Sequence, residues 1–165
     1  MASLSISIVT YRQEEGPLHE CLASLGTAID YARQQGSITD YLVTVIDNST
    51  DTDIQDGLRK LIESTWQRPG TTLRFLPTRQ NLGYGRAHNL AITTSTMDYH
   101  LVLNPDVVLD RESLHNACLF MQAHGRTALL TPVVYNGHSE REYLNKNYPD
   151  VTRLLLRGFA PGFVK

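Results

Sequence analysis

Short strand-forming runs alternate with helix-forming segments along most of the chain, and this alternation restricts the fold more than any other feature. Residues 3–10 are typical of the runs, because Leu4, Ile6 and Ile8 alternate with serines. Further strand-forming runs stand at residues 41–46, 73–76, 100–103 and 129–135. Strands that alternate with helices predict an α/β fold with a mostly parallel sheet flanked by helices.

The segments between these runs carry the signals of helix starts and stops. Gly16-Pro17 places a proline at its favoured position in the first turn, and an apolar stripe then continues until Gly36. A second helix is expected after the polar residues 47–51, which suit a turn and a helix cap, and it ends at Pro69-Gly70. Asp110 is placed to cap a later helix.

Composition excludes several classes of protein. The chain of 165 residues is 41% hydrophobic and 19% charged, which is typical of a globular domain and unlike a disordered chain. A net charge of -2 gives no electrostatic reason to bind nucleic acid. No apolar run approaches the ~20 residues of a membrane span, and the N-terminus lacks the basic residues of a secretory signal. Cys21 and Cys118 stand among apolar residues without metal-ligand spacing, which predicts reduced core thiols and a cytoplasmic location.

Polar side chains follow the ends of the first four expected strands. In strand order they are Thr10 and Tyr11, Asp47 and Asn48, Arg79 and Asn81, and Asn104 and Asp106. Open parallel sheets bind ligands beyond the carboxyl ends of their strands, so these residues are expected at one functional edge. Every strand must also end in polar solvent, so each residue alone is weak support for a site.

A glycine-rich loop, Asn-Leu-Gly-Tyr-Gly-Arg-Ala-His-Asn, occupies residues 81–89 and leads into a helix. Gly83 and Gly85 allow the backbone to approach a ligand, and Arg86 beside the helix N-terminus suits a phosphate. The loop does not match a dinucleotide-binding fingerprint, because His88 replaces the third glycine and the loop follows the third strand. The alternative is that the glycines only shape a turn. His88 could contact a phosphate, but a histidine in this position is more often a surface or packing residue.

Asp106 follows a short apolar strand, where a carboxylate can hold a hard cation that in turn holds a diphosphate. An aspartate after a strand is more often a turn residue or a helix cap. Asp110 is the better cap for the following helix, so a role as helix cap does not explain Asp106.

Four segments, in one order, resemble family 2 glycosyltransferases of the GT-A fold, and within that family the rhamnosyltransferase-like branch. They are Ser-Ile-Val-Thr-Tyr at 7–11, Val-Ile-Asp-Asn-Ser-Thr-Asp at 45–51, the loop at 81–89 and Leu-Asn-Pro-Asp at 103–106. The resemblance implies a dTDP- or UDP-linked sugar donor, rhamnose in that branch, and Mg²⁺ or Mn²⁺ as cofactor. It also implies transfer with inversion to a saccharide or lipid-linked acceptor in bacterial polysaccharide synthesis.

The resemblance also assigns roles to residues. The donor-binding residues that it implies are Thr10, Tyr11, Asp47, Asn81, Gly83, Arg86, Asn104 and Asp106. Among them, Thr10 and Tyr11 line the nucleotide pocket, Asp47 reads the base or ribose, and Asp106 is the metal-holding aspartate. Asn104 departs from the family, because it stands where the Asp-x-Asp element has its first acid.

The acceptor side is less complete than the donor side. Members of the family are usually longer and carry their acidic general base in a later segment, where this chain offers only Glu140, Glu142 and Asp150, none in a matching motif. We therefore expect a nucleotide-sugar-binding domain at residues 1–136 and the start of an acceptor-side region at 137–165, polar and then basic-apolar. Such a chain binds a donor but transfers sugar negligibly.

Two alternatives stay open from the sequence. A nucleotide-sugar-binding module without turnover is the rival to the enzyme. The tail around residues 154–159 fits peripheral contact with the inner face of an anionic membrane, where lipid-linked acceptors are found, or a segment left unpacked. The sequence also leaves the oligomeric state open, a homo-oligomer included.

Overall fold

The computed structural model describes residues 1–68, 72–136 and 140–142. The chain forms two compact units, Met1–Ala128 and Leu129–Lys165. The first unit holds the whole four-stranded sheet and its helices, and it therefore contains every residue expected at the sheet edge.

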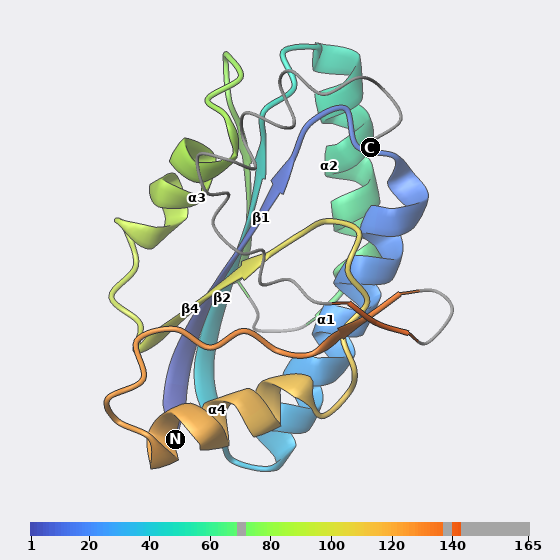
Figure 1. Ribbon diagram of the computed structural model, residues 1–165. Helices are drawn as coiled ribbons and strands as arrows, with labels where there is room; N and C mark the ends of the chain where they lie inside the picture. The colour runs from blue at the N-terminus through green and yellow to red at the C-terminus, as the bar shows by residue number, and fades with distance from the viewer. Residues whose placement is uncertain (69–71, 137–139, 143–165) are drawn as a thin grey trace, which may run out of the picture. The chain divides into compact units, whose positions relative to one another are not determined.

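The sheet of the first unit is parallel throughout, with strand order β3-β2-β1-β4 (Figure 1). Its strands are β1 (Ala2–Thr10), β2 (Ile38–Asp47), β3 (Thr72–Pro77) and β4 (Tyr99–Leu103). The helices are α1 (Glu15–Gln34), α2 (Thr52–Thr65), α3 (Tyr84–Ile92) and α4 (Ser113–Ala123). The parallel sheet and the alternation of strands with helices confirm the predicted fold class.

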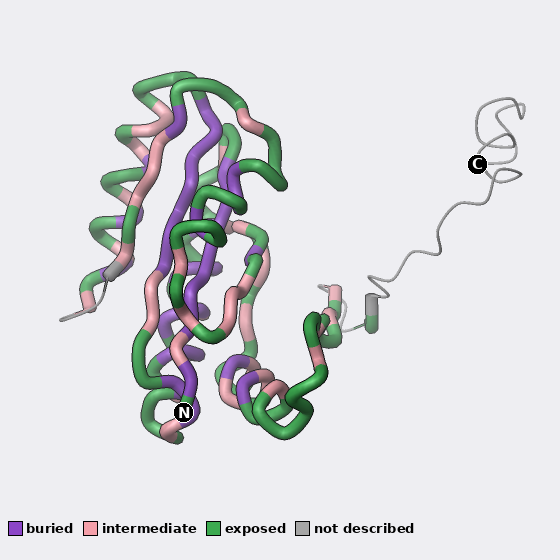
Figure 2. Tube along the Cα trace, turned by 90° about the vertical axis from the view of Figure 1, so that its left-hand side faces the viewer, coloured by how far each residue is buried: buried purple, intermediate pink, exposed green. Residues whose placement is uncertain are grey.

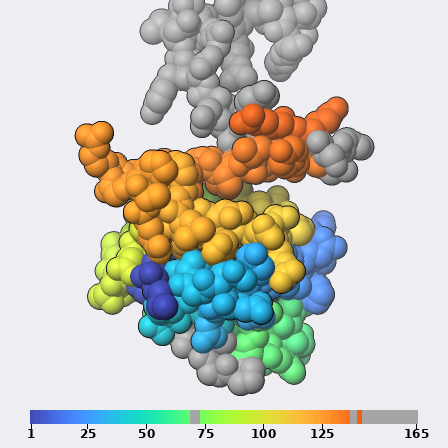
Figure 3. Space-filling view, turned by 90° about the horizontal axis from the view of Figure 1, so that it is seen from below, coloured from blue at the N-terminus to red at the C-terminus, as the bar shows by residue number. Residues whose placement is uncertain are grey.

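Helices cover both faces of the sheet. Helices α1 and α2 lie on one face and α3 lies on the other (Figure 1). Helix α4 packs against α1, and the two are in contact in Figure 3. Buried residues are concentrated in the strands, as Figure 2 shows.

The larger core lies between the sheet and α1. The alternating residues Leu4, Ile6 and Ile8 of β1 are buried there, together with the apolar stripe of the helix, which includes Leu22 and Ile29. Burial of each large aliphatic side chain stabilises the fold by about 1.5–3 kcal/mol. Both cysteines are buried and free, as predicted, and burial raises the pKa of Cys21 to about 12, which makes it an inert core thiol.

Two predicted helix boundaries are confirmed. Gly36 follows α1 with φ 69°, a left-handed conformation that favours glycine. The side chain of Asp51 caps α2 by accepting hydrogen bonds from the backbone N–H groups of Asp53 and Ile54.

The predicted fifth strand at residues 129–135 is wrong for most of its length. Only Val134–Tyr135 is a strand (β5), and it pairs antiparallel with Arg141–Glu142 (β6) in a separate two-stranded sheet of the second unit. Pro132 lies inside the run and has no N–H to donate to a ladder. The second unit also begins at Leu129, before the boundary that the sequence suggested after residue 136.

The face of the sheet under α3 holds a buried polar chain. The serines that alternate with the core residues of β1, Ser5 and Ser7, are buried, although such a row is more typical of a solvent-exposed face. Ser7 Oγ lies 2.7 Å from both His88 Nδ1 and His100 Nε2, and Ser5 Oγ lies 2.6 Å from His100 Nδ1. His88 is therefore a packing residue, one of the two interpretations that its position favoured.

The fold keeps both histidines of this buried polar cluster, His88 and His100, neutral. Burial, reinforced by the neighbouring His100, lowers the pKa of His88 from 6.5 to about 4, and burial also lowers the pKa of His100. Between pH 6.5 and about 4 the unfolded chain therefore binds protons that the folded chain does not.

We expect the free energy of unfolding to fall as the pH is lowered through this window. The loss is at most about 1.4 kcal/mol per pH unit for each histidine. Urea unfolding at pH 7 and pH 5 measures it, and His88→Asn, which removes one titrating ring, should show a smaller pH dependence. An equal free energy of unfolding at the two pH values would contradict the account of the buried histidines.

Candidate functional site

The first part of the site is a paired threonine and aspartate at the carboxyl ends of β1 and β2. Thr10 lies opposite Asp47 in the parallel register, and both side chains are buried. Thr10 Oγ1 donates a hydrogen bond to Asp47 Oδ1 at 2.9 Å. Ser49 donates to the same oxygen twice, from its hydroxyl at 2.9 Å and from its backbone N–H at 3.3 Å.

The two oxygens of the Asp47 carboxylate therefore differ. Oδ1 accepts three hydrogen bonds, whereas Oδ2 is buried and has no hydrogen-bond partner among the described residues. A buried polar atom without a partner costs about 1–3 kcal/mol, and more when it is charged. Such an orphaned acceptor at a sheet edge is suited to a ligand that brings an N–H or O–H donor.

The residues after β1 adopt a strained turn beside this pair. Arg12 has φ 49°, which is uncommon for a residue with a side chain and costs about 1–2 kcal/mol. Its backbone N–H donates to Ser49 Oγ at 2.8 Å, which holds the conformation. The exposed Tyr11 stacks against Arg12, with the guanidinium 5.6 Å from the ring centroid. Local strain of this kind is concentrated at functional sites.

The glycine-rich loop is fastened to the end of β2 by Asn48. The buried amide of Asn48 donates to Gly83 O and accepts from the backbone N–H of Leu82, both at 3.4 Å. Asn81 Oδ1 accepts from the backbone N–H of Gly83 at 2.8 Å. Gly83 itself has φ 76°, so the turn into α3 requires glycine. The structure thus brings two predicted residues, Asn81 and Gly83, next to the end of β2.

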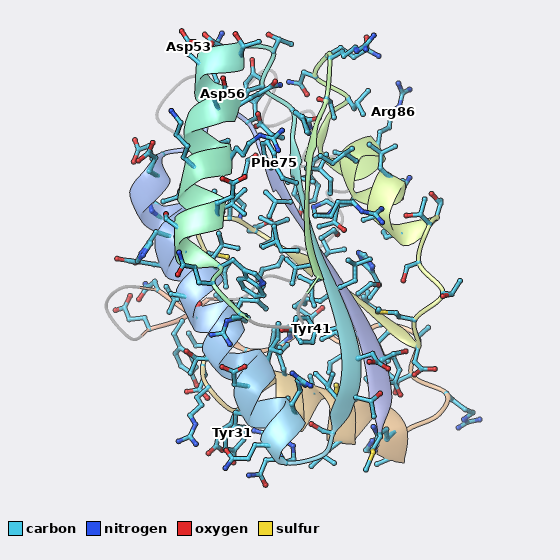
Figure 4. The ribbon with its side chains drawn as sticks, turned by 180° about the vertical axis from the view of Figure 1, so that it is seen from behind. Tyr31, Tyr41, Asp53, Asp56, Phe75 and Arg86 are labelled. Carbon is cyan, nitrogen blue, oxygen red and sulfur yellow. The ribbon has the colours of Figure 1, made fainter. Side chains whose placement is uncertain are left out.

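Arg86 lies in the first turn of α3, as predicted, and is exposed. Its side chain points away from the sheet (Figure 4). Within the described residues, no hydrogen bond or ion pair ties Arg86 to the other members of the site.

Asn104 and Asp106 follow β4 and are both exposed. Tyr84, the first residue of α3, donates a hydrogen bond from its hydroxyl to Asn104 Oδ1 at 2.7 Å. Burial and the nearby charge of Asp106 raise the pKa of the Tyr84 phenol. The charge of Asp106 also contributes, after burial, to the raised pKa of Cys21, whose thiol donates to Asn104 O at 3.5 Å. The Asp106 carboxylate therefore acts electrostatically on both Tyr84 of α3 and Cys21 of α1.

The oxygen ligands at this edge fit a cation that is shared with a substrate. The described residues contain no group of three or more His, Cys, Asp or Glu side chains that could hold a metal ion by themselves. Asp106 offers one exposed carboxylate, and Asn104 Oδ1 already accepts the Tyr84 hydroxyl. Mg²⁺ is commonly held by one or two carboxylates together with substrate phosphates, and Asp106 is compatible with that mode.

The structural roles of three residues of the site were not predicted from the sequence. Asn48 and Thr78 fasten neighbouring segments, since Thr78 N–H donates to Asp47 O at 2.8 Å. Tyr84 bridges α3 and the end of β4. The position of Asn48 directly after Asp47 could have suggested its role, whereas no sequence signal pairs Tyr84 with Asn104.

The suggested general bases are not assigned to this edge. Glu140 belongs to the second unit, where its carboxylate accepts from Asn136 Nδ2 at 3.2 Å, directly before β6. The side chain of Glu142 and all of Asp150, like residues 143–165 as a whole, lie outside the described part of the chain. Among the described residues, no helix is long and apolar enough to cross a membrane.

Solved structures with similar folds include the two that follow. The crystal structure of S. aureus TarS 1-349 has a TM-score of 0.55 and 22% sequence identity, over 74% of this chain and 33% of that one. The mannosyltransferase PcManGT from Pyrobaculum calidifontis, in complex with GDP-Man and Mn2+, has a TM-score of 0.58 and 21% identity, over 73% of this chain and 32% of that one. At these identities the likeness shows the fold, which is that of GT-A glycosyltransferases. The chain spans about a third of the length of these proteins.

A comparison with curated proteins finds no match. The family model for Glycosyl transferase family 2 matches residues 5–163, which is nearly the whole chain and includes every residue of the sheet edge described above. The chain belongs to glycosyl transferase family 2.

Proposed function

We propose that the chain binds the nucleoside diphosphate of a sugar donor at the carboxyl edge of its sheet, as the donor-binding part of an inverting glycosyltransferase. The observation that carries the proposal is the buried Oδ2 of Asp47, which has no hydrogen-bond partner in the described part of the chain, while Oδ1 accepts three hydrogen bonds. Uracil, thymine and guanine each present a ring N–H that such an oxygen can accept. Membership of a glycosyltransferase family supports a nucleotide sugar over other ligands with an N–H group.

The other parts of the edge fit the rest of the donor. Tyr11 is half exposed next to Thr10 and offers a ring face to a base. The N-terminus of α3, with Gly83 before it and Arg86 in its first turn, favours a diphosphate. We assign the same donor role to Asn81, which shapes this loop.

Asp106 would hold Mg²⁺ or Mn²⁺ together with the donor diphosphate. The bound ion would stabilise the charge that grows on the leaving diphosphate. Asn104 contributes hydrogen-bonding capacity instead of a second carboxylate, which is consistent with a metal site completed by the substrate. The structure of PcManGT with GDP-Man and Mn2+ supports this arrangement by likeness of fold alone.

For the finer identity of the substrates, we retain the proposal from the sequence resemblance. The donor is linked to dTDP or UDP and carries a sugar such as rhamnose, and the acceptor is a saccharide or a lipid-linked saccharide in bacterial polysaccharide synthesis. Such chemistry would take place in the cytoplasm at the inner face of the membrane. Glu140, Glu142 and Asp150 are the acids available in the second unit for the base that transfer needs.

A binding module without turnover is the second candidate. It is favoured by one observation: the acids among the proposed donor-binding residues are Asp47, which is buried and hydrogen-bonded, and Asp106, which suits a cation. Neither is left over to deprotonate an acceptor. Sugar transfer from a radiolabelled donor distinguishes the two candidates.

Asp47→Asn tests the proposed function most sharply within the protein. The amide can keep the bond from Thr10, but it replaces the free oxygen with an N–H₂ group that opposes the N–H of a base. A lost hydrogen bond to a charged group is worth about 1.5–3 kcal/mol, so affinity should fall about 10- to 100-fold. Calorimetric titration with UDP, dTDP and GDP measures the loss and identifies the preferred base.

Asp53→Asn provides the matched control, because Asp53 is exposed on α2 (Figure 4) and the variant makes the same change in charge. The control should bind like the wild type. Wild-type affinity in a folded Asp47→Asn variant would contradict the proposed role of Asp47.

Asp106→Ala should remove the dependence of nucleotide binding on a divalent cation while leaving the fold intact, because the side chain is exposed. Titrations with UDP in MgCl₂ and in chelator measure the difference. Chelator should weaken binding to the wild type and to the control Asp56→Ala, but not to the variant. An equal effect of chelator on Asp106→Ala would assign the cation to other ligands.

A further inference from the structure

The Ser–His chain under α3 is a feature that the proposed function does not use. It joins three elements: Ser5 and Ser7 from β1, His100 from β4 and His88 from α3. A solvent-exposed serine row would need no such partners, whereas these serines are buried beneath a helix. The histidines satisfy them without introducing a charge.

The directions of the hydrogen bonds can be assigned by using each proton once. Ser5 Oγ donates to Tyr99 O at 3.2 Å, so it accepts from His100 Nδ1–H. His100 Nε2 then accepts from Ser7, and Ser7 accepts from His88 Nδ1–H. His88 is the last member of this hydrogen-bonded series, and no described residue bonds to its buried Nε2. The imidazole of His88 is thus anchored to β1 through one nitrogen.

The anchored ring of His88 faces the site. The Tyr84 ring packs on it edge-to-face, with centroids 4.3 Å apart and planes at 72°. Tyr84 is otherwise 52% exposed, so His88 is its fixed support on the protein side. The Tyr84 hydroxyl then donates to Asn104 Oδ1 at 2.7 Å. This bond leaves the two N–H groups of the Asn104 amide free to face a ligand.

We propose that His88 is a positioning residue of the donor site: held by Ser7, it fixes Tyr84, and Tyr84 fixes Asn104 with its amide N–H groups toward the diphosphate. The inference rests on the proposed function for the identity of the ligand. The coupling of His88 to Asn104 is a property of the protein without ligand and can be tested separately.

The first test uses the ligand-free protein. The side-chain amide signals of Asn104 in a ¹H–¹⁵N spectrum, assigned by their loss in Asn104→Asp, report the environment of the amide. Tyr84→Phe should shift these signals because it removes the bond to Oδ1. His88→Ala should also shift them, and should shift them little further when added to Tyr84→Phe. The control is His124→Ala, which changes an exposed histidine of the first unit and should leave the signals in place.

The second test uses affinity. His88→Ala should weaken UDP binding about five- to tenfold, the loss expected for one ordinary hydrogen bond. Uridine, which lacks the diphosphate, should bind as it does to the wild type. In the Tyr84→Phe background, His88→Ala should have little further effect, because residues that act in one path are not additive.

Three results would overturn the proposal: unchanged Asn104 signals in a folded His88→Ala variant, losses that add to those of Tyr84→Phe, or equal losses for uridine and UDP. Ser7→Ala makes the same test through the anchor if His88→Ala fails to fold. If the wild type does not bind UDP, the proposed function fails, while the Asn104 signals still decide whether His88 positions this residue.

Discussion

The buried carboxylate of Asp47 is the interaction on which the rest of the site depends. Burying a carboxylate is costly unless hydrogen bonds compensate it, and Thr10 and Ser49 provide them for Oδ1 of Asp47 alone. The fold therefore holds an acceptor in place at the sheet edge before any ligand arrives. Preorganised groups of this kind lower the cost of ordering the site on binding.

Three consecutive residues at the end of β2 each fasten a different segment to this point. Asp47 is bonded to β1, Asn48 is bonded to the glycine-rich loop, and Ser49 holds the strained backbone of Arg12 after β1. The glycine-rich loop and the turn after β1 are thus attached to a strand that is hydrogen-bonded on both sides. Strain at Arg12 can persist because its neighbours fix it.

The sequence predicted the sheet edge better than it predicted the packing behind it. Alternation of strands and helices was sufficient to place Thr10, Asp47, Asn81 and Asp106 at strand ends, because parallel strands share one carboxyl edge. The burial of Ser5 and Ser7 could not be read from their period of two, since it depends on which helix covers that face.

Two further features could not be predicted from the sequence pattern. One is a contact between distant residues, and the other depends on a single missing backbone N–H group. The bond between Tyr84 and Asn104 joins residues that are far apart in the chain and carry no shared pattern. The apolar run at 129–135 has the composition of a strand, but Pro132 interrupts its ladder, and only Val134–Tyr135 pairs.

The most direct measurement of the central claim is a map of backbone amide shifts in a ¹H–¹⁵N spectrum as UDP and Mg²⁺ are added. A nucleotide site at Asp47 should give the largest changes at residues 10–12, 47–49, 81–86 and 104–106, which lie at or after the strand ends. Residues of α4 and of the second half of α2, which run away from the carboxyl edge of the sheet, should change little. Saturable changes confined to those helices, with residues 47–49 unaffected, would contradict a nucleotide site at Asp47.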